Sequence, residues 1–238
     1  MQKVLTQQQV EAFHHDCFVE EQVAHFVEMV GDLSGKAVIV DVGGGIGLFA
    51  HRLQSLTGHE VRVLDLDQAS VALCERLGVK CSVGDALKPE FVGDEGMASF
   101  NMILHHLVGA TEKETRVLQA RALGAWHTRG ARLFVNEYIY ESQLGNFSGW
   151  LIYQITKSKI LSAIGRAVST FVPSLRANTF GVGVRFRSVE EWRNLFEAAG
   201  YRIGRHMRGE EEPVSIPQRM LLIKNRRRDS FLLETLPR

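Results

Sequence analysis

The feature that most constrains this chain is a short apolar segment that runs into alternating glycines. Residues 37–40 are all apolar, and glycines follow at Gly43, Gly45 and Gly47. A helical apolar pattern then covers residues 48–56. A buried strand, a glycine turn and a helix form the first half of a nucleotide-binding βαβ unit. Glycine suits such a turn because the bend is tight and a ligand approaches the backbone. We therefore expect a side chain at Gly43 or Gly45 to occupy ligand space.

The spacing of these glycines separates the segment from two better-known nucleotide motifs. A dinucleotide fingerprint has its third glycine one residue later than Gly47, and the Gly-Lys-Ser/Thr of phosphate loops is absent. Asp41 stands two residues before the first glycine. This Asp-x-Gly-x-Gly-x-Gly pattern resembles motif I of the class I S-adenosylmethionine-dependent methyltransferases. The alternative is a glycine-rich turn from strand to helix that binds no ligand.

Two carboxylates follow the second predicted strand, Val61–Leu64. Asp65 stands 22 positions after the first glycine, near the spacing at which a carboxylate accepts both hydroxyls of a ribose. Leu66 lies beside it. Asp67 precedes a predicted helix over 68–77, where an aspartate serves as an N-cap. We therefore assign the ribose to Asp65.

A third carboxylate follows the third predicted strand, Lys80–Val83. The resemblance implies that Asp85 holds the amino group of an adenine and that the backbone of Ala86 donates to the ring, which suits the hydrogen-bonding capacity of these groups. A simple turn aspartate is the alternative.

Two adjacent histidines follow the fourth predicted strand, Phe100–Leu104. Ligands of open α/β sheets lie beyond the carboxyl ends of strands, and strand alternation places His105 and His106 on different sides. The resemblance implies that the backbone of Leu104 and His105 borders the cofactor and that His106 faces the methyl acceptor. A histidine there can act as a general base near neutral pH. A structural role remains open for both.

Polar residues also follow the fifth predicted strand, Arg132–Val135. Before it, Thr111 and Glu114 indicate a capping box for a helix that ends at His127. Glu137 is a candidate to orient a histidine, to hold a substrate amine or to act as a base, and Tyr138 is a candidate to shape the pocket. An exposed surface glutamate is the alternative.

Residues 143–186 resemble the family least and form a helical apolar stripe with interleaved lysines and arginines. We expect a substrate lid over an apolar or aromatic small-molecule pocket. Its candidate lining residues are Trp150, Tyr153, Phe180 and Phe186. A homodimer face and a basic amphipathic helix resting on a membrane are the alternatives.

The two ends of the chain carry weaker signals. We expect helices at Thr6–His14 and Val19–Val30, with Phe13, His14 and His15 covering the cofactor. Adjacent histidines alone do not make a metal site, so we expect no metal. Near the other end, the sequence predicts a helix over 189–199 and a strand pair, Tyr201–Met207 and Arg219–Lys224. From Asn225 onward, including Arg226 to Arg228, we expect a solvated tail.

The composition narrows the function classes. The net charge of +1 gives no overall case for nucleic acid. Cys17, Cys74 and Cys81 have no metal or disulfide spacing, and we find no signal peptide or membrane span, so we expect a cytoplasmic protein.

The sequence predicts an α/β fold with a Rossmann-like seven-stranded sheet, helices on both faces, an antiparallel last strand pair and a helical insert after strand 5. We divide it into an N-terminal segment (1–30), a cofactor-binding core (31–142), a lid (143–186), the rest of the core sheet (187–225) and a tail (226–238).

The resemblance implies an S-adenosylmethionine-dependent methyltransferase that methylates an O, N or C nucleophile of a small acceptor. Its catalytic candidates are His106, His105 and Glu137. Its cofactor candidates are Asp41, Gly43, Gly45, Gly47, Asp65, Leu66, Asp85, Ala86, Leu104 and His105. An RNA or protein methyltransferase and a non-catalytic cofactor-binding partner protein are the alternatives.

Overall fold

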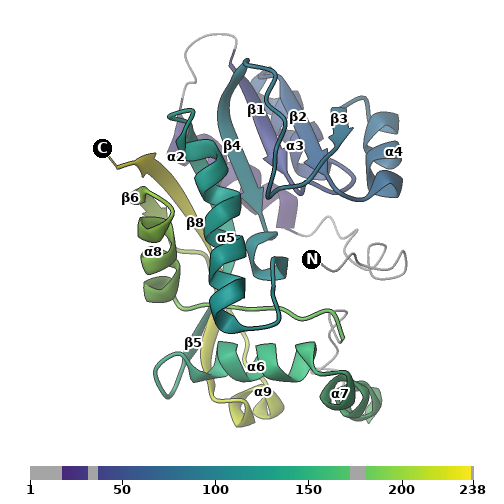
Figure 1. Cartoon of the computed structure of the whole chain (residues 1–238), viewed down its shortest axis with the longest axis vertical. Coiled ribbons are helices and arrows are strands. Elements are labelled where there is room, and N and C mark those ends of the chain that lie inside the picture. The colour runs from purple at the N-terminus through teal and green to yellow at the C-terminus, as the bar shows by residue number, and fades with distance from the viewer. Residues whose placement is uncertain (1–17, 32–36, 172–180, 237–238) are drawn as a thin grey trace.

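The computed structural model describes residues 18–31, 37–171 and 181–236. They form one mixed sheet with helices on both faces (Figure 1). The strand order is β3-β2-β1-β4-β5-β8-β6, and a short β7 pairs with β8. The order reverses between β1 and β4, which is where open α/β sheets bind ligands.

The parallel half of the sheet follows the sequence pattern closely. Its elements are β1 (Val38–Val42), α3 (Leu48–Thr57), β2 (Val61–Asp65), α4 (Gln68–Arg76) and β3 (Lys80–Val83). Every residue of β1 is buried, as expected for a central strand covered on both faces. The apolar run before the glycines is therefore the centre of the sheet.

The fourth strand differs from its prediction. β4 covers Glu95–Asn101, so it begins earlier than Phe100 and ends before Leu104. Met102 then adopts a left-handed conformation (φ 56°), which turns the chain into a short 3-10 helix, η2 (Leu104–His106). The two histidines therefore lie on a helical turn, and strand alternation does not apply to them.

α5 (Glu112–His127) begins one residue after the predicted Thr111, which serves as its N-cap. Thr111 Oγ1 accepts from the Glu114 amide at 3.1 Å. The carboxylate of Glu114 accepts from the amide of Ala110 instead of Thr111, so only half of the predicted capping box forms.

The largest corrections concern the last third of the chain. β5 (Arg132–Ser142) is far longer than the predicted Arg132–Val135, because it pairs along its length with antiparallel β8 (Ile223–Thr235). The expected tail is thus a central strand, and its residues 229–233 are all buried. The sequence did not indicate this strand because three consecutive charged residues, Arg226 to Arg228, interrupt the apolar alternation of a half-buried strand.

Other C-terminal elements surround β8. α8 (Val189–Ala198) and β6 (Tyr201–Met207) match the prediction. The expected strand at 219–224 does not form as one element: its first two residues end helix α9 (Ile216–Met220), a turn follows, and its last two residues begin β8. The acidic segment forms the two-residue β7 (Glu211–Glu212), which gives eight strands in place of the predicted seven.

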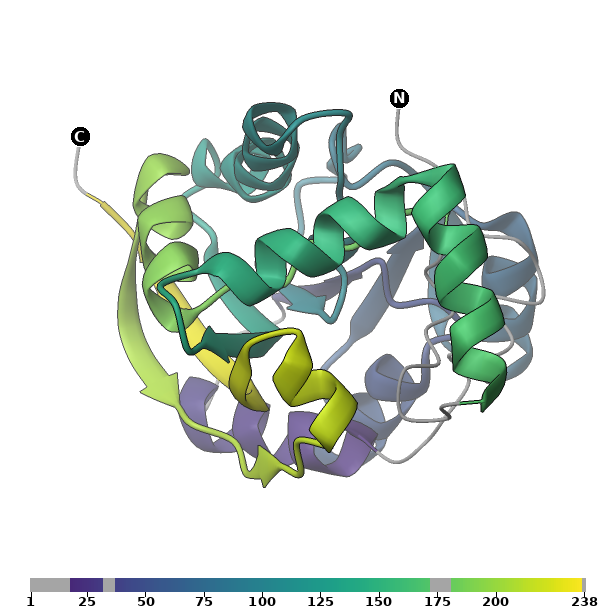
Figure 2. The same ribbon diagram turned by 90° about the horizontal axis from the view of Figure 1, so that it is seen from below.

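Helices cover the two faces with separate cores. α2 (Val19–Val30), at its predicted bounds, packs with α3 over Phe134. α5 and α8 cover the other face around Trp126 and Trp192. The insert forms two helices, α6 (Phe147–Lys157) and α7 (Lys159–Phe171), which lie at one end of the molecule (Figure 2). Within the described ranges, every helix is too short or too polar to cross a bilayer.

Candidate functional site

The glycine turn brings β1 and α3 together at the switch point of the sheet. Gly43, Gly45 and Gly47 all have positive φ (+71°, +57° and +81°). A Cβ at Gly45 would meet nothing within 4 Å, which leaves this position open to a ligand. A Cβ at Gly43 would lie 1.8 Å from Ile103 Cδ1. The packed side chain after β4 therefore explains glycine at this position, and ligand space stays a prediction at Gly45.

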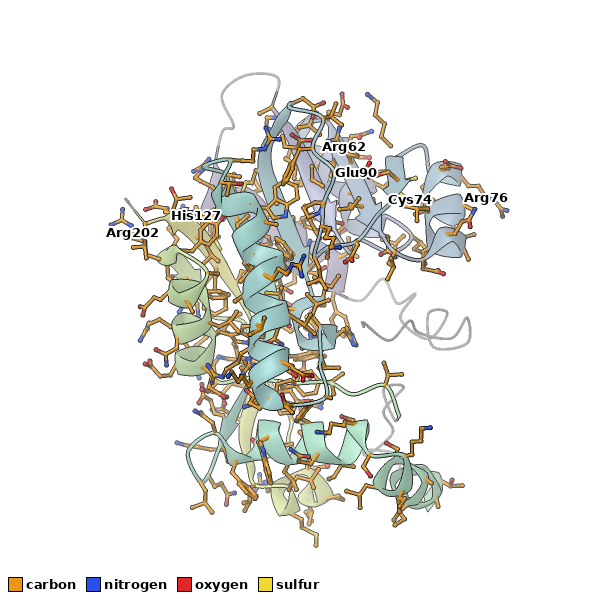
Figure 3. All side chains as sticks on the ribbon, viewed as in Figure 1. Arg62, Cys74, Arg76, Glu90, His127 and Arg202 are labelled. Atoms are coloured by element: carbon orange, nitrogen blue, oxygen red, sulfur yellow. The ribbon has the colours of Figure 1, made fainter. Side chains whose placement is uncertain are left out.

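At Gly47, a neighbouring side chain from α4 leaves no room for a Cβ. A Cβ there would lie 2.5 Å from Cys74 Sγ. Figure 3 shows Cys74 on the side of α4 that faces the sheet, whereas Arg76 extends away from it. The third glycine thus lets α3 and α4 approach each other.

Asp65 ties the end of β2 to the glycine turn. Its Oδ2 accepts from the Gly45 amide at 2.8 Å, and its Oδ1 accepts from the Asp67 amide at 2.8 Å. Burial raises the pKa of this carboxyl. Asp67 caps α4, as predicted, and accepts from the Ser70 amide at 2.8 Å. Leu66, between them, is 40% exposed.

Asp41 lies fully buried beneath the same turn. Its Oδ1 accepts from Asn101 Nδ2 at 3.0 Å, and its Oδ2 has no hydrogen-bond partner among the described residues. Burial, opposed by the Asn101 hydrogen bond and reinforced by nearby Asp65, raises its pKa to about 7. A buried carboxylate oxygen without a donor is costly, so this place suits a ligand that brings a cation or a donor.

Asp85 and Ala86 follow β3. Asp85 Oδ1 accepts from the Leu87 amide at 2.8 Å, which is the pattern of an Asx turn. Asp85 is partly exposed and Ala86 is buried. The predicted adenine contact therefore stays a prediction for these two residues.

A buried glutamate fixes the histidine turn. Glu137 Oε2 lies 2.6 Å from His105 Nδ1, and its Oε1 accepts from the Leu104 amide at 2.6 Å. Both Glu137 and His105 are buried. Because a carboxylate accepts, Nδ1 of His105 is the donor in this bond, so the neutral ring has its lone pair on Nε2. This is the arrangement in which a histidine can take a proton from a substrate.

His106 lies against the same ring instead of on the opposite side, with the two ring centroids 4.1 Å apart. Its Nδ1 is enclosed by the protein. Burial, with a contribution from His105, holds the pKa of His106 well below its ordinary value. His106 is therefore neutral at physiological pH, and the carboxylate that orients a base is bonded to His105.

Behind the histidine turn lies a polar network that sequence reasoning missed. Gln119 Nε2 donates to the Leu104 carbonyl at 2.9 Å. Arg187 Nε and Nη2 both donate to Gln119 Oε1, at 2.9 and 2.7 Å. Arg187 Nη1 donates to Glu112 Oε1 at 2.8 Å, and the side chain of Arg187 is fully buried. Both backbone groups of Leu104 are thus occupied within the protein.

Arg185 adds a second connection. Its amide donates to the His105 carbonyl at 2.9 Å, and its guanidinium pairs with Glu112 and Glu191. Burial acts to raise the pKa of Glu112, but Arg187 and Arg185 outweigh it and the pKa is lowered. No local motif marks these residues, because their partners come from α5 and α8.

Aromatic side chains surround the histidines on one side. Phe186 stacks on Tyr140 (4.3 Å between centroids) and lies 5.0 Å from His105. The ring of Tyr138 lies 6.3 Å from that of His105. Of the predicted lining residues, the structure therefore brings Tyr138 and Phe186 to the histidines.

The other predicted lining residues lie elsewhere. Tyr153 is fully buried and its hydroxyl donates to the Gly109 carbonyl at 2.8 Å, so it ties α6 to the loop after η2. Trp150 is 39% exposed and packs on Phe147. Phe180, and the predicted covering residues Phe13, His14 and His15, fall outside the described residues. In the part that is described, no three histidine, cysteine or acidic side chains converge as metal ligands would.

Comparison with known proteins gives a match by structure only. No family model matches the sequence, and no curated protein matches it. The mitomycin 7-O-methyltransferase MmcR is similar at 19% identity with a TM-score of 0.56, over 92% of this chain and 54% of that one. This chain therefore spans about half the length of MmcR.

Two further structures match over most of both chains. The 1,6-didemethyltoxoflavin-N1-methyltransferase of Burkholderia thailandensis is 14% identical, with a TM-score of 0.58 over 95% of this chain and 82% of that one. The geranyl diphosphate C-methyltransferase of Streptomyces coelicolor A3(2) is 11% identical, with a TM-score of 0.57 over 98% of this chain and 89% of that one. Both were solved with S-adenosylhomocysteine. The chain therefore has the fold of class I S-adenosylmethionine-dependent methyltransferases.

Proposed function

We propose that this protein is an S-adenosylmethionine-dependent methyltransferase that acts on a small molecule. The observation that carries the proposal is the carboxylate pair at the switch point. Asp65 is bonded to the amide of Gly45, the position of the turn that is open to a ligand. Asp41 presents a buried oxygen without a partner, among the described residues, beneath the same turn.

These residues fit the cofactor by their chemistry. Asp65 would accept from the ribose hydroxyls, Asp85 would accept from the adenine amine, and Asp41 would face the cationic amino-acid part. When bound, S-adenosylmethionine supplies a methyl group already activated by the sulfonium. Alignment of the acceptor is then the main task of the protein, worth up to about 7–11 kcal/mol in ideal cases.

His105 is the better candidate for the base. Its Nε2 lone pair can take a proton from an acceptor hydroxyl or amine, and Glu137 at 2.6 Å stabilises the imidazolium that forms. Our sequence analysis placed His106 first. The bond to Glu137 favours His105 instead, with His106 packed against its ring.

The acceptor that suits this site is apolar or aromatic. Tyr138, Tyr140 and Phe186 form an aromatic cluster beside His105. The RNA alternative loses its only sequence support, since Arg226 and Arg228 pair with Glu212 and lie in a strand of the sheet.

Calorimetry with S-adenosylhomocysteine tests the cofactor site. We expect wild type to bind and Asp65→Asn to lose about 10–100-fold in affinity, because a hydrogen bond to a charged group contributes about 1.5–3 kcal/mol. Asp67→Asn is the matched control, since Asp67 caps α4 and should leave affinity unchanged. Absence of any binding heat with folded protein would refute the proposal.

Turnover with a panel of phenols, carboxylates and amines tests the base. We expect His105→Ala to lower kcat by about 10²–10⁴-fold, the range typical of general-base catalysis, while cofactor affinity stays unchanged. His106→Ala should lower kcat less. A larger loss of kcat in His106→Ala than in His105→Ala would favour His106 as the base. Binding of the cofactor without any turnover would indicate a non-catalytic cofactor-binding protein.

A further inference from the structure

One end of the molecule combines exposed apolar side chains from three helices. Figures 1 and 2 place α6, α7 and α9 at this end, nearest the viewer in Figure 2. Eight exposed large apolar side chains come from these helices or the turn before α6. They are Leu144, Phe147, Trp150, Ile160, Leu161, Ile164, Ile216 and Met220, with exposures from 39% to 78%. We call this surface the apolar end.

The chain segments that build the apolar end contain no acidic residue. Residues 143–189 and 213–228 hold eleven of the chain's 28 lysines and arginines and none of its 27 aspartates and glutamates. The rest of the chain is therefore net acidic, although the whole carries only +1. Such separation of charge, unlike a large net charge, gives a molecule a preferred orientation toward a charged surface.

Part of this basic charge is available at the surface. Arg185 and Arg187 pair with Glu112, and Arg226 to Arg228 pair with carboxylates of other segments. Lys159, Arg219 and Lys224 are exposed, and no ion pair joins them to a carboxylate within the described part of the chain. Lys159 directly precedes the exposed Ile160, and Arg219 lies between the exposed Ile216 and Met220.

We propose that the apolar end docks on the surface of an anionic lipid bilayer. Ile160, Leu161 and Ile164 lie on one face of α7, as in helices that rest in the membrane interface. Apolar burial drives such docking, and each lysine or arginine near an anionic surface adds about 1 kcal/mol.

The charge distribution disfavours a second copy of this chain as the occupant. An isologous dimer through the apolar end would bring the same surface of two protomers together. Lys159, Arg219 and Lys224 would then face like charges with no carboxylate from 143–189 or 213–228 to pair them. An anionic membrane supplies the missing opposite charge.

Docking in this orientation has a consequence that rests on the proposed function. Figure 1 shows the carboxyl ends of β1 and β4 directed toward the end that carries α6 and α7. The edge of the sheet that carries the histidine turn would then lie on the bilayer side of the molecule, so an apolar acceptor that partitions into the lipid would be concentrated near the site. Binding to vesicles is measured without cofactor or acceptor, so its failure leaves the methyltransferase proposal standing.

Vesicle flotation with the full chain tests the proposal. We expect weak binding to phosphatidylcholine vesicles and at least about tenfold tighter binding when phosphatidylglycerol is included, with the gain lost at high salt. The double variant Ile160→Glu/Ile164→Glu should lose about tenfold or more in affinity for the mixed vesicles. The matched control Leu56→Glu/Val117→Glu alters two exposed side chains on α3 and α5 and should bind as wild type does.

A charge variant separates the electrostatic contribution to vesicle binding from the apolar one. Lys159→Glu/Arg219→Glu should abolish the preference for phosphatidylglycerol while the protein keeps its melting temperature. Three results would overturn the proposal: no binding to mixed vesicles at low salt, equal loss in the control variant, or a dimer in sedimentation that Ile160→Glu/Ile164→Glu abolishes while vesicle binding is unchanged.

Discussion

The cofactor side and the histidine side of the candidate site are held together in different ways. Asp65 bonds to Gly45 and to Asp67, which stand 20 and 2 positions away in the chain. Arg187, behind the histidines, bonds to Gln119 and Glu112, which stand 68 and 75 positions away. The contacts of Asp65 thus join segments closer in the chain than the contacts of Arg187 behind the histidines. The two sides should respond differently to substitution.

The largest effect is expected on the histidine side. Arg187→Met removes a fully buried cation that bonds to Gln119 and Glu112. We expect the free energy of unfolding to fall by about 3–5 kcal/mol, because breaking a buried pair leaves its partners uncompensated. Urea denaturation measures this change.

Arg202→Met is the control for this variant. Arg202 pairs with Glu234 at 2.8 Å, but both side chains are well exposed, and Figure 3 shows Arg202 extending from the surface. An exposed pair contributes about 0–1 kcal/mol. Equal losses in the two variants would show that the network around Arg187 has no special structural role.

The next effect concerns the glycine turn, where the two sides meet. Gly43→Ala should destabilise the protein by about 1–3 kcal/mol, because alanine is strained at φ +71° and its Cβ would displace Ile103. Gly45→Ala has similar backbone strain at φ +57° but no neighbour within 4 Å. We therefore expect a smaller loss of stability and a larger loss of S-adenosylhomocysteine affinity from Gly45→Ala, measured by thermal unfolding and calorimetry. Identical behaviour of the two would contradict the contact with Ile103.

The same contrast explains what the sequence could predict. The first three parallel strands, the cap at Asp67 and the helix at Val19–Val30 follow from periodicity and local hydrogen bonds, and the structure has them close to the prediction. The pairing of Glu137 with His105 was one of several options, since a sequence does not show which carboxylate meets which ring. Gln119, Arg185 and Arg187 gave no signal, because each acts through partners distant in the chain.

The last strand shows a different limit. Residues 225–235 include three consecutive arginines, Arg226 to Arg228, and local charge predicts a solvated tail. In the structure, Arg227 bonds to Asp229 on the same strand at 2.9 Å, and Arg228 pairs with the distant Glu21 and Glu212, so these charges are neutralised. Pairing on both edges, with β5 and β6, then places the apolar residues 231–233 in the core.

The sharpest contrast between the two sides is in the pH dependence of stability. Burial raises the pKa of Asp41 from 3.8 to about 7, so the folded protein holds a proton that the unfolded chain has lost. Stability from this group is complete below about pH 4 and is lost as the pH rises to about 7, at up to about 1.4 kcal/mol per pH unit. Asp41→Asn should remove that slope. Glu112, on the histidine side, has a lowered pKa, so its contribution is present above pH 4.5 and is lost as the pH falls. The test is the free energy of unfolding of wild type, Asp41→Asn and Glu112→Gln, measured as a function of pH. The contribution lost in Asp41→Asn should fall as the pH rises, and the contribution lost in Glu112→Gln should rise with pH. Contributions that change in the same direction would contradict the opposite pKa shifts of the two carboxyls.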